Sequence, residues 1–166
     1  MTADEIKTLL RLEPHPIEGG YYRRTYTSGV SVALLGGVRP YGTAIYYLLE
    51  EGKFSEMHVL ASDEIFHFYL GDPVEMFFLL LDGSSALVTL GPDLTAGQQP
   101  QVLVPAGVWQ GARLVDDGKT EGGKFALLGC TVTPGFDFAD YRSGKYEELA
   151  AGWPAEAQRI KKLTRS

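Results

Sequence analysis

The 166-residue sequence has a single cysteine, so no disulfide can form within the chain. That residue, Cys130, lies in the apolar run FALLGCTV. We therefore expect a buried structural thiol rather than a nucleophile. A chain without disulfides is typical of a reducing compartment, and we predict a cytoplasmic location.

Long apolar runs and clusters of basic residues are also lacking. The longest apolar run covers residues 76–81, which is too short to cross a bilayer. The N-terminus has no basic start followed by an apolar stretch, so we predict no signal peptide. Basic residues cluster only as Arg23-Arg24 and Lys161-Lys162, and the net charge is −6. These features predict that neither a membrane nor a nucleic acid is a partner.

Glycine and aromatic residues are abundant, with 20 glycines, 9 tyrosines and 8 phenylalanines. This composition is typical of short strands joined by glycine turns. Runs bounded by turn residues predict strands over residues 21–27, 43–49, 54–60, 64–70, 74–81, 85–90, 101–104, 108–115 and 124–132. No helix is predicted between them, so we expect an all-β fold, an antiparallel double-sheet jelly-roll barrel.

Helices are predicted only at the two ends of the chain. Thr2 and Glu5 can form a capping box for a short N-terminal helix over residues 2–12. Residues 143–151 and 154–163 are expected to form C-terminal helices. Residues 29–41 are expected to be an irregular loop that closes over a pocket mouth or contacts a second subunit. We predict one domain over residues 1–166, with the barrel core at about 18–135.

Two of the three histidines lie in one stretch, GKFSEMHVLASDEIFHFYLG, at residues 52–71. Because side chains alternate across a strand, His58 and Glu64 can both point into a barrel while His67 points away. The same alternation places six further residues on the inward faces: Phe54, Glu56, Leu60, Phe66, Phe68 and Leu70. We expect Glu56 to lie at the rim. The stretch therefore predicts a mostly apolar pocket with a few converging polar groups.

The remaining histidines have other predicted roles. His67 and Tyr69 share the outward face, where they would pack under a helix or in a subunit interface. His15 lies between Pro14 and Pro16, and we expect it to be solvated or to cap a turn.

The spacing of Gly52, His58, Glu64 and Gly71 resembles the first motif of the cupin superfamily, Gly-x5-His-x-His-x3,4-Glu-x6-Gly. The run PAGVWQ at residues 105–110 resembles part of the second cupin motif. Two metal ligands of the family pattern are replaced, by Leu60 and Gln110. Segments such as PHPIEGGYYRRTY and SDEIFHFYLGDP are similar to a family of small cupins labelled predicted sugar epimerases, which share their fold with the RmlC-type sugar-nucleotide epimerases.

The resemblance implies a base histidine backed by an aspartate, together with a tyrosine acid. His58 stands at the matching position. Asp137 or Asp140 would be the backing carboxylate. The candidate acids are Tyr22, Tyr46 and Tyr47. Similar cupins commonly pair through sheet edges, so the resemblance also implies a homodimer.

Three hypotheses for the function follow. The first is a metal-independent isomerase or epimerase of a carbohydrate-like substrate, with His58 and Glu64 as the catalytic pair. The second is a non-catalytic binding or sensor protein in which the same residues only hold a small molecule. The third is a metal-dependent cupin with an incomplete ligand set of His58, Glu64 and Gln110. Because two strong ligands and one weak one make a poor site, no cofactor is expected.

The candidate ligand-binding residues are polar or aromatic and belong to the predicted strands. They are Tyr22, Arg24, Tyr46, Phe66, Phe68 and Gln110. Arg24 close to Tyr22 could bind an anionic group, or the two could belong to a solvated face or a subunit contact.

Overall fold

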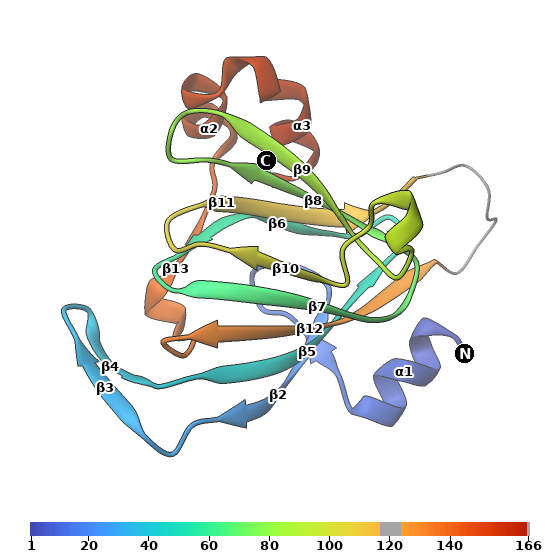
Figure 1. The fold of residues 1–166 in the computed structure, drawn as a ribbon, viewed down its shortest axis with the longest axis vertical. Coiled ribbons are helices and arrows are strands. Elements are labelled where there is room, and N and C mark those ends of the chain that lie inside the picture. Colours follow the sequence, from blue (N-terminus) through green and yellow to red (C-terminus); the bar gives the residue numbers. More distant parts are fainter. Residues whose placement is uncertain (117–123, 166) are drawn as a thin grey trace.

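A computed structural model of the protein describes residues 1–116 and 124–165. Two antiparallel sheets pack face to face (Figure 1). The first sheet has the order β1 (Glu13–Pro14), β2 (Tyr21–Thr27), β5 (Thr43–Glu50), β12 (Phe125–Thr133), β7 (Asp63–Gly71) and β10 (Gln101–Val104). The second has the order β13 (Tyr141–Ser143), β6 (Phe54–Leu60), β11 (Trp109–Leu114), β8 (Val74–Leu79) and β9 (Ser85–Leu90). The predicted double-sheet jelly roll is confirmed.

The main core lies between the two sheets. It contains side chains from both, including Phe66, Met76, Phe78 and Leu128. Alternation sends Phe77 and Leu79 of β8 to the opposite face, where they are also buried. Both faces of β8 are therefore covered, which its continuous apolar run requires.

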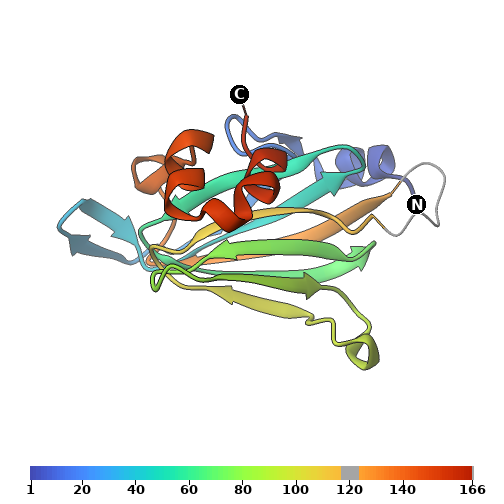
Figure 2. The same cartoon turned by 90° about the horizontal axis from the view of Figure 1, so that it is seen from above.

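Helices cover the outer faces of both sheets (Figures 1 and 2). At the C-terminus, α2 (Tyr146–Gly152), η3 (Pro154–Glu156) and α3 (Ala157–Lys162) contribute to a second apolar cluster. Its buried members are Met57, Phe77, Leu79, Leu149, Ile160 and Leu163. The N-terminal helix α1 (Ala3–Leu10) packs Ile6 against Leu48 and Leu127 of the first sheet.

The predicted capping box of α1 is confirmed. The Thr2 hydroxyl accepts a hydrogen bond from the Glu5 amide at 3.2 Å, and the Thr2 amide donates to Glu5 Oε2 at 2.8 Å. The remaining 3₁₀ turns are η1 (Leu94–Ala96) and η2 (Phe138–Asp140). No helix among the described residues is long and apolar enough to span a membrane.

Register shifts mark three β-bulges, in β6, β7 and β2, and the first two break the alternation expected for the strands that carry His58 and Glu64. Opposite β11, Gln110 pairs with His58 but Ala112 pairs with Ser55, so β6 holds one extra residue. Phe54 therefore packs against the cluster under the C-terminal helices, and the prediction that it shares the inward face of His58 is wrong.

The second bulge is in β7. Here Leu127 pairs with Leu70 and Leu128 pairs with Phe68, so that Tyr69 is the extra residue. Leu70 is 37% exposed and does not point into the barrel as predicted.

Residues 29–41 do not form the predicted irregular loop. They contain a hairpin of β3 (Ser31–Leu34) and β4 (Gly37–Pro40), which is a separate two-stranded sheet. The turn needs glycine because Gly37 has a φ of +120°, a region that other residues avoid. Figures 1 and 2 show the hairpin projecting from the barrel.

We expect the cluster under the C-terminal helices to contribute strongly to stability. Ile160 is fully buried there, so Ile160→Ala should lower the free energy of unfolding by about 2–5 kcal/mol through the cavity that it leaves. Urea denaturation followed by circular dichroism measures this loss. Leu81→Ala is the control, since Leu81 is 78% exposed and should change stability by less than about 0.5 kcal/mol. Equal losses in the two variants would contradict the prediction.

Candidate functional site

A narrow cavity of about 30 Å³ lies between the two sheets. The first sheet supplies β2, β5, β7 and β12 to its wall, and the second supplies β6 and β13. The lining residues are His15, Glu18, Tyr22, Arg24, Thr43, Ile45, His58, Leu60, Glu64, Cys130, Val132, Phe136 and Tyr141. With this volume the cavity has room for about one or two water molecules.

His58 has a fixed tautomer. Its side chain is buried on β6, and its Nδ1 lies 2.7 Å from the Glu56 backbone oxygen. A carbonyl only accepts, so Nδ1 must carry the proton. In the neutral ring Nε2 then has a free lone pair. The ring stacks on Tyr141, with centroids 4.9 Å apart and planes at 14°, which fixes its orientation.

Glu64 faces His58 from the other sheet. It is 7% exposed on β7, and its Oε2 accepts a hydrogen bond of 2.7 Å from the amide nitrogen of Gln110. Burial raises the pKa of this carboxyl to about 7, and the Glu18 carboxylate adds to the rise. His58 and the bond from Gln110 act in the opposite direction. Near neutral pH, Glu64 can therefore either donate or accept a proton.

His15 and Glu18 belong to the pocket, and the sequence argument missed both in this role. The backbone amide of Glu18 donates to His15 Nδ1 at 2.9 Å, so the predicted turn-capping is confirmed. The His15 side chain is only 5% exposed, however, and the expectation of a solvated histidine is wrong. Burial lowers the pKa of His15, and the nearby Glu18 partly opposes this effect.

The segment between β1 and β2 packs Glu18 against β6 of the second sheet. Glu18 is 9% exposed, and its Oε1 accepts a hydrogen bond from the Ser55 hydroxyl at 2.5 Å. The Glu56 amide also donates to the Glu18 backbone oxygen at 2.9 Å. The sequence does hold a signal for this pair, because His15 and Glu18 lie three residues apart, just before the strand at residues 21–27.

Glu56 is buried and does not lie at the rim as expected. Its Oε1 accepts hydrogen bonds from the Tyr141 hydroxyl at 3.0 Å and from the Ser143 hydroxyl at 2.6 Å. Arg165 Nε lies 3.4 Å from Glu56 Oε2. Glu56 therefore joins β6 to β13 and to the C-terminal segment, next to the backbone oxygen that binds His58.

Neither aspartate proposed to back His58 does so. Asp137 accepts a hydrogen bond from the Ala139 amide and caps η2. Asp140 forms a two-bond ion pair with Arg39, at 2.6 and 2.8 Å. The backbone oxygen of Glu56 takes the place of the expected carboxylate.

The three candidate tyrosine acids lie in different environments. Tyr22 lines the cavity. Tyr47 is buried in the barrel core, and its hydroxyl donates to the Gly19 backbone oxygen at 2.9 Å. Tyr46 lies on the outer face of the first sheet, near Tyr69, and the structure does not bring it to the pocket.

Of the other candidate ligand-binding residues, some lie at the cavity and others lie away from it. Arg24 lines the cavity, with its guanidinium carbon 5.8 Å from the centroid of the Phe136 ring. Gln110 contacts Glu64. Phe66 and Phe68 belong to the barrel core but do not line the cavity. His67 is on the outer face of β7, where its Nε2 lies 3.0 Å from the Thr131 hydroxyl.

The donor set does not fit a metal ion. Within residues 1–116 and 124–165, no group of three or more histidine, cysteine or acidic side chains could hold one. Gln110 directs its NH₂ group at Glu64, so it offers that neighbour a donor rather than a ligand oxygen. The apolar side chain of Leu60 lines the cavity beside His58. No chemical step is therefore assigned to a metal here.

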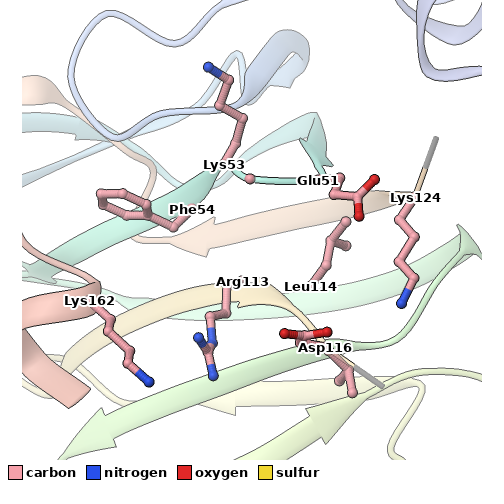
Figure 3. Close-up of a pocket in the computed structure, with 10 residues that line it drawn as sticks. Glu51, Lys53, Phe54, Arg113, Leu114, Asp116, Lys124 and Lys162 are labelled. Atoms are coloured by element: carbon pink, nitrogen blue, oxygen red, sulfur yellow. The ribbon is translucent and has the colours of Figure 1, made fainter. Parts of the chain in front are cut away.

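A larger cleft, of about 390 Å³, lies away from this site, between the start of β6, the end of β11 and α3 (Figure 3). Its charged residues have both signs: Glu51, Lys53, Arg113, Asp116, Lys124 and Lys162. Arg113 is bound to Glu75 at 3.2 Å, and Lys53 points away from Arg113 and Lys162. Of these charged residues only Lys124 is buried, whereas the buried Glu18, His58 and Glu64 meet in the barrel pocket, so we place the site in the pocket.

Comparisons with known proteins agree with the fold. A family model described as "Cupin superfamily (DUF985)" matches residues 4–143. The uncharacterized protein YML079W of Saccharomyces cerevisiae is 30% identical over 146 residues, which cover 79% of this chain and 70% of the yeast protein.

Two solved structures are similar over nearly their whole length. A hypothetical protein from Leishmania major has a TM-score of 0.92 and 30% identity, with complete coverage of both chains. Protein SO0799 from Shewanella oneidensis has a TM-score of 0.88 and 34% identity, covering 99% of this chain and 98% of that one.

The raised pKa of Glu64 predicts a pH-dependent stability. A carboxyl whose pKa rises from 4.5 to about 7 on folding favours the folded state at low pH, and this contribution is lost as the pH rises between those values. The Glu64→Gln variant keeps a partner for Gln110 but cannot ionise. Relative to the wild type, it should gain on the order of 2–3 kcal/mol in unfolding free energy between pH 5 and pH 8.

Urea titrations of both proteins at the two pH values measure this difference. The lowered pKa of His15 changes stability in the opposite direction, but it is common to both proteins and cancels in the comparison. A difference that does not change with pH would show that Glu64 ionises normally.

Proposed function

This chain belongs to the cupin superfamily, in the family DUF985, and we propose that its barrel pocket transfers protons as a metal-independent isomerase or epimerase of a small carbohydrate-like molecule. One observation carries the proposal. His58 and Glu64 are both buried and line one cavity from opposite sheets. A molecule between the sheets would present one face to the imidazole and the other to the carboxyl group.

Epimerisation beside a carbonyl needs a base on one face and an acid on the other. In the proposed reaction His58 Nε2 removes the proton from the carbon next to the carbonyl, and the electron pair moves to the carbonyl oxygen as an enolate. Protonated Glu64 then donates its proton to the opposite face of that carbon. The products are the inverted centre, an imidazolium and a carboxylate, and exchange with solvent restores the starting protonation states.

The surroundings of the two groups suit these roles. The Glu56 carbonyl keeps the proton on His58 Nδ1, which leaves Nε2 as the base. Burial holds the pKa of Glu64 near 7, so a substantial fraction is protonated at neutral pH. Arg24 lines the cavity and is exposed, so its guanidinium is suited to an anionic substituent of the substrate.

The volume of the cavity limits the substrate. About 30 Å³ admits only the reacting atoms of a sugar. A complete sugar ring would need Arg24 and the half-buried Phe136 to change rotamer at the mouth. The proposal is therefore for a small substrate, or for one whose larger part stays outside the barrel.

Non-catalytic binding is the second candidate, and one observation favours it. Glu64 and Gln110 are hydrogen-bonded to each other, which is also what a pocket with a purely structural polar pair would show. Native mass spectrometry separates the candidates, because a binding protein would retain a ligand that it does not alter.

The isomerase proposal predicts solvent exchange that depends on His58. Incubation with a panel of aldoses, ketoses, uronates and their phosphate esters in D₂O should place deuterium on one substrate carbon, detected by NMR. His58→Ala should lower the exchange rate by about 10²–10⁴-fold because it removes the base, and Glu64→Gln should lower the rate of epimerisation by a similar factor because it removes the acid on the opposite face. His67→Ala is the matched control, since His67 lies on the outer face of β7 and should leave the rate unchanged.

Circular dichroism of each variant shows whether the fold is kept. The absence of exchange with every compound in the panel, together with an unaltered ligand that copurifies, would overturn the isomerase proposal in favour of binding.

Metal content is expected to be low. Untagged protein purified without chelator should contain less than about 0.1 transition-metal ion per chain by elemental analysis, because His58, Glu64 and Gln110 form an incomplete ligand set. A stoichiometric metal that is lost in His58→Ala would contradict this expectation and favour the metal-dependent hypothesis.

A further inference from the structure

The pocket wall contains a second histidine and a second buried carboxyl group that the proposed reaction does not use. His15 and Glu18 both line the cavity, and the His15 side chain is 5% exposed. They belong to the segment that joins β1 to β2, whereas His58 and Glu64 belong to strands of the two sheets. Buried polar groups that converge on a cavity are the usual means by which a pocket orients a ligand.

The tautomer of His15 is opposite to that of His58. His15 Nδ1 accepts a hydrogen bond of 2.9 Å from the backbone amide of Glu18 and a longer one, of 3.4 Å, from that of Ile17. A backbone N–H only donates, so Nδ1 holds the lone pair and the neutral ring carries its proton on Nε2. Burial lowers the pKa of His15 and favours this neutral form. The cavity therefore has an acceptor in His58 Nε2 and a donor in His15 Nε2.

Aromatic neighbours hold the His15 ring in place. Its centroid lies 4.7 Å from that of Tyr22, with the ring planes at 60°, and 6.1 Å from that of Phe138. The two backbone amides at Nδ1 fix the same ring through its polar edge. A ring held by these contacts keeps Nε2 in one position, so its N–H is preorganised for a ligand atom.

The proton on His15 Nε2 has no acceptor within the described part of the chain. Glu18 Oε2 lies 3.9 Å away, which is too far for a hydrogen bond. Every fully buried side-chain nitrogen or oxygen of the described residues has a partner, so Nε2, which lacks one, must border open space. Since His15 lines the cavity, this is space that a ligand atom can occupy.

The acceptor on the other side of this gap is Glu18. The Ser55 hydroxyl donates to Glu18 Oε1, which leaves Oε2 facing His15. The Tyr47 hydroxyl also lies near this carboxyl group, but its one proton is donated to the Gly19 backbone oxygen. Oε2 is therefore able to accept a hydrogen bond from a ligand.

We propose that His15 and Glu18 form a subsite that recognises one hydroxyl group of the substrate. The hydroxyl oxygen accepts a hydrogen bond from His15 Nε2, and the hydroxyl proton is donated to Glu18 Oε2. An oxygen atom about 2.8 Å from each partner spans the 3.9 Å between them. Among the oxygen substituents of a sugar, only a hydroxyl group both accepts and donates. A carbonyl or ether oxygen only accepts, and would leave the buried carboxylate unpaired.

This subsite deepens the proposed function, because it identifies the substrate as one that carries a hydroxyl group next to the reacting carbon. It rests on the proposed function for the class of substrate. Recognition and proton transfer nevertheless involve different residues of the cavity. Binding therefore tests the subsite, whereas solvent exchange tests the reaction.

The first measurement needs no ligand. Long-range ¹H–¹⁵N NMR spectra distinguish the imidazole tautomers, and at about pH 8 they should show His15 protonated on Nε2 and His58 protonated on Nδ1. The variants His15→Asn and His58→Ala assign the signals, because each variant lacks one set. A His15 ring that is protonated on Nδ1, or that is charged at this pH, would overturn the proposal.

The second measurement is the binding of sugars that differ by one hydroxyl group. The probes are the aldoses, ketoses, uronates and phosphate esters of the exchange panel, each with its monodeoxy and monodeoxyfluoro derivatives. Isothermal titration calorimetry gives the affinities. At one carbon of a compound that binds, the deoxy derivative should bind the wild type about 10–100-fold more weakly than the parent, since it leaves both partners unpaired. The fluoro derivative at that carbon should also bind weakly, because fluorine cannot donate to Glu18.

Two conservative variants separate recognition from a structural role. His15→Asn keeps an oxygen acceptor for the Glu18 amide but loses the ring N–H, and Glu18→Gln keeps an acceptor for Ser55 but presents an NH₂ group to His15. In each variant the parent sugar should bind about tenfold more weakly, and the difference between parent and deoxy derivative should fall below about threefold. His67→Asn is the matched control on the outer face of β7, and it should keep the wild-type difference.

Several results would overturn the subsite: equal affinity for the parent and every deoxy derivative, no binding by any compound of the panel, or a difference that persists in His15→Asn and Glu18→Gln. Loss of the difference in the control would do the same. Solvent exchange without selectivity for a hydroxyl group would reject the subsite and keep the proposed reaction. Selective binding without exchange would reject the reaction and keep the subsite.

Discussion

The extra residue in β6 is the constraint on which the site depends. Without it, Phe54 and His58 would share a face, and a phenylalanine would enter the barrel beside the histidine. The bulge instead turns Phe54 out to the helix-covered cluster and leaves Ser55 free to bind Glu18. Within the bulge, the Met57 amide donates to the Leu163 oxygen at 2.7 Å, and the Met57 oxygen accepts from the Gly144 amide at 2.6 Å. Segments at the C-terminus therefore satisfy the backbone groups that a bulge leaves unpaired.

Three buried carboxyl groups lie close to the pocket. Their hydrogen-bond and charge partners compensate the negative charge to different degrees. Glu56 accepts two hydroxyl hydrogen bonds and has Arg165 nearby. Glu18 accepts a hydrogen bond from Ser55 and lies near His15. Glu64 has neutral side-chain partners, the amide of Gln110 and the thiol of Cys130, and burial raises its pKa to about 7. An uncompensated charge in a low-dielectric site shifts its protonation equilibrium, which explains why Glu64 is the group suited to exchange protons.

Sequence reasoning was most accurate where the signal is local and periodic. The capping box at Thr2, the doubly covered strand β8 and the jelly-roll class all follow from patterns within short windows. It failed at Phe54 and Leu70 because a bulge shifts the register by one residue and leaves no mark in the alternation. It also failed at Glu18 and Glu56, because a glutamate is normally exposed and only tertiary contacts explain its burial. The aspartates near the C-terminus could be placed close to the barrel, but the sequence could not show that Asp140 binds Arg39.

That ion pair links the β3–β4 hairpin to the pocket wall. Asp140 binds Arg39 of the hairpin, and the next residue, Tyr141, stacks on His58 and donates to Glu56. The short segment that carries the stacking partner of His58 is therefore anchored to the hairpin on one side and to the barrel on the other. Two adjacent residues, Asp140 and Tyr141, thus connect a surface hairpin to the buried histidine, although the hairpin and the residues that line the cavity come from different parts of the sequence.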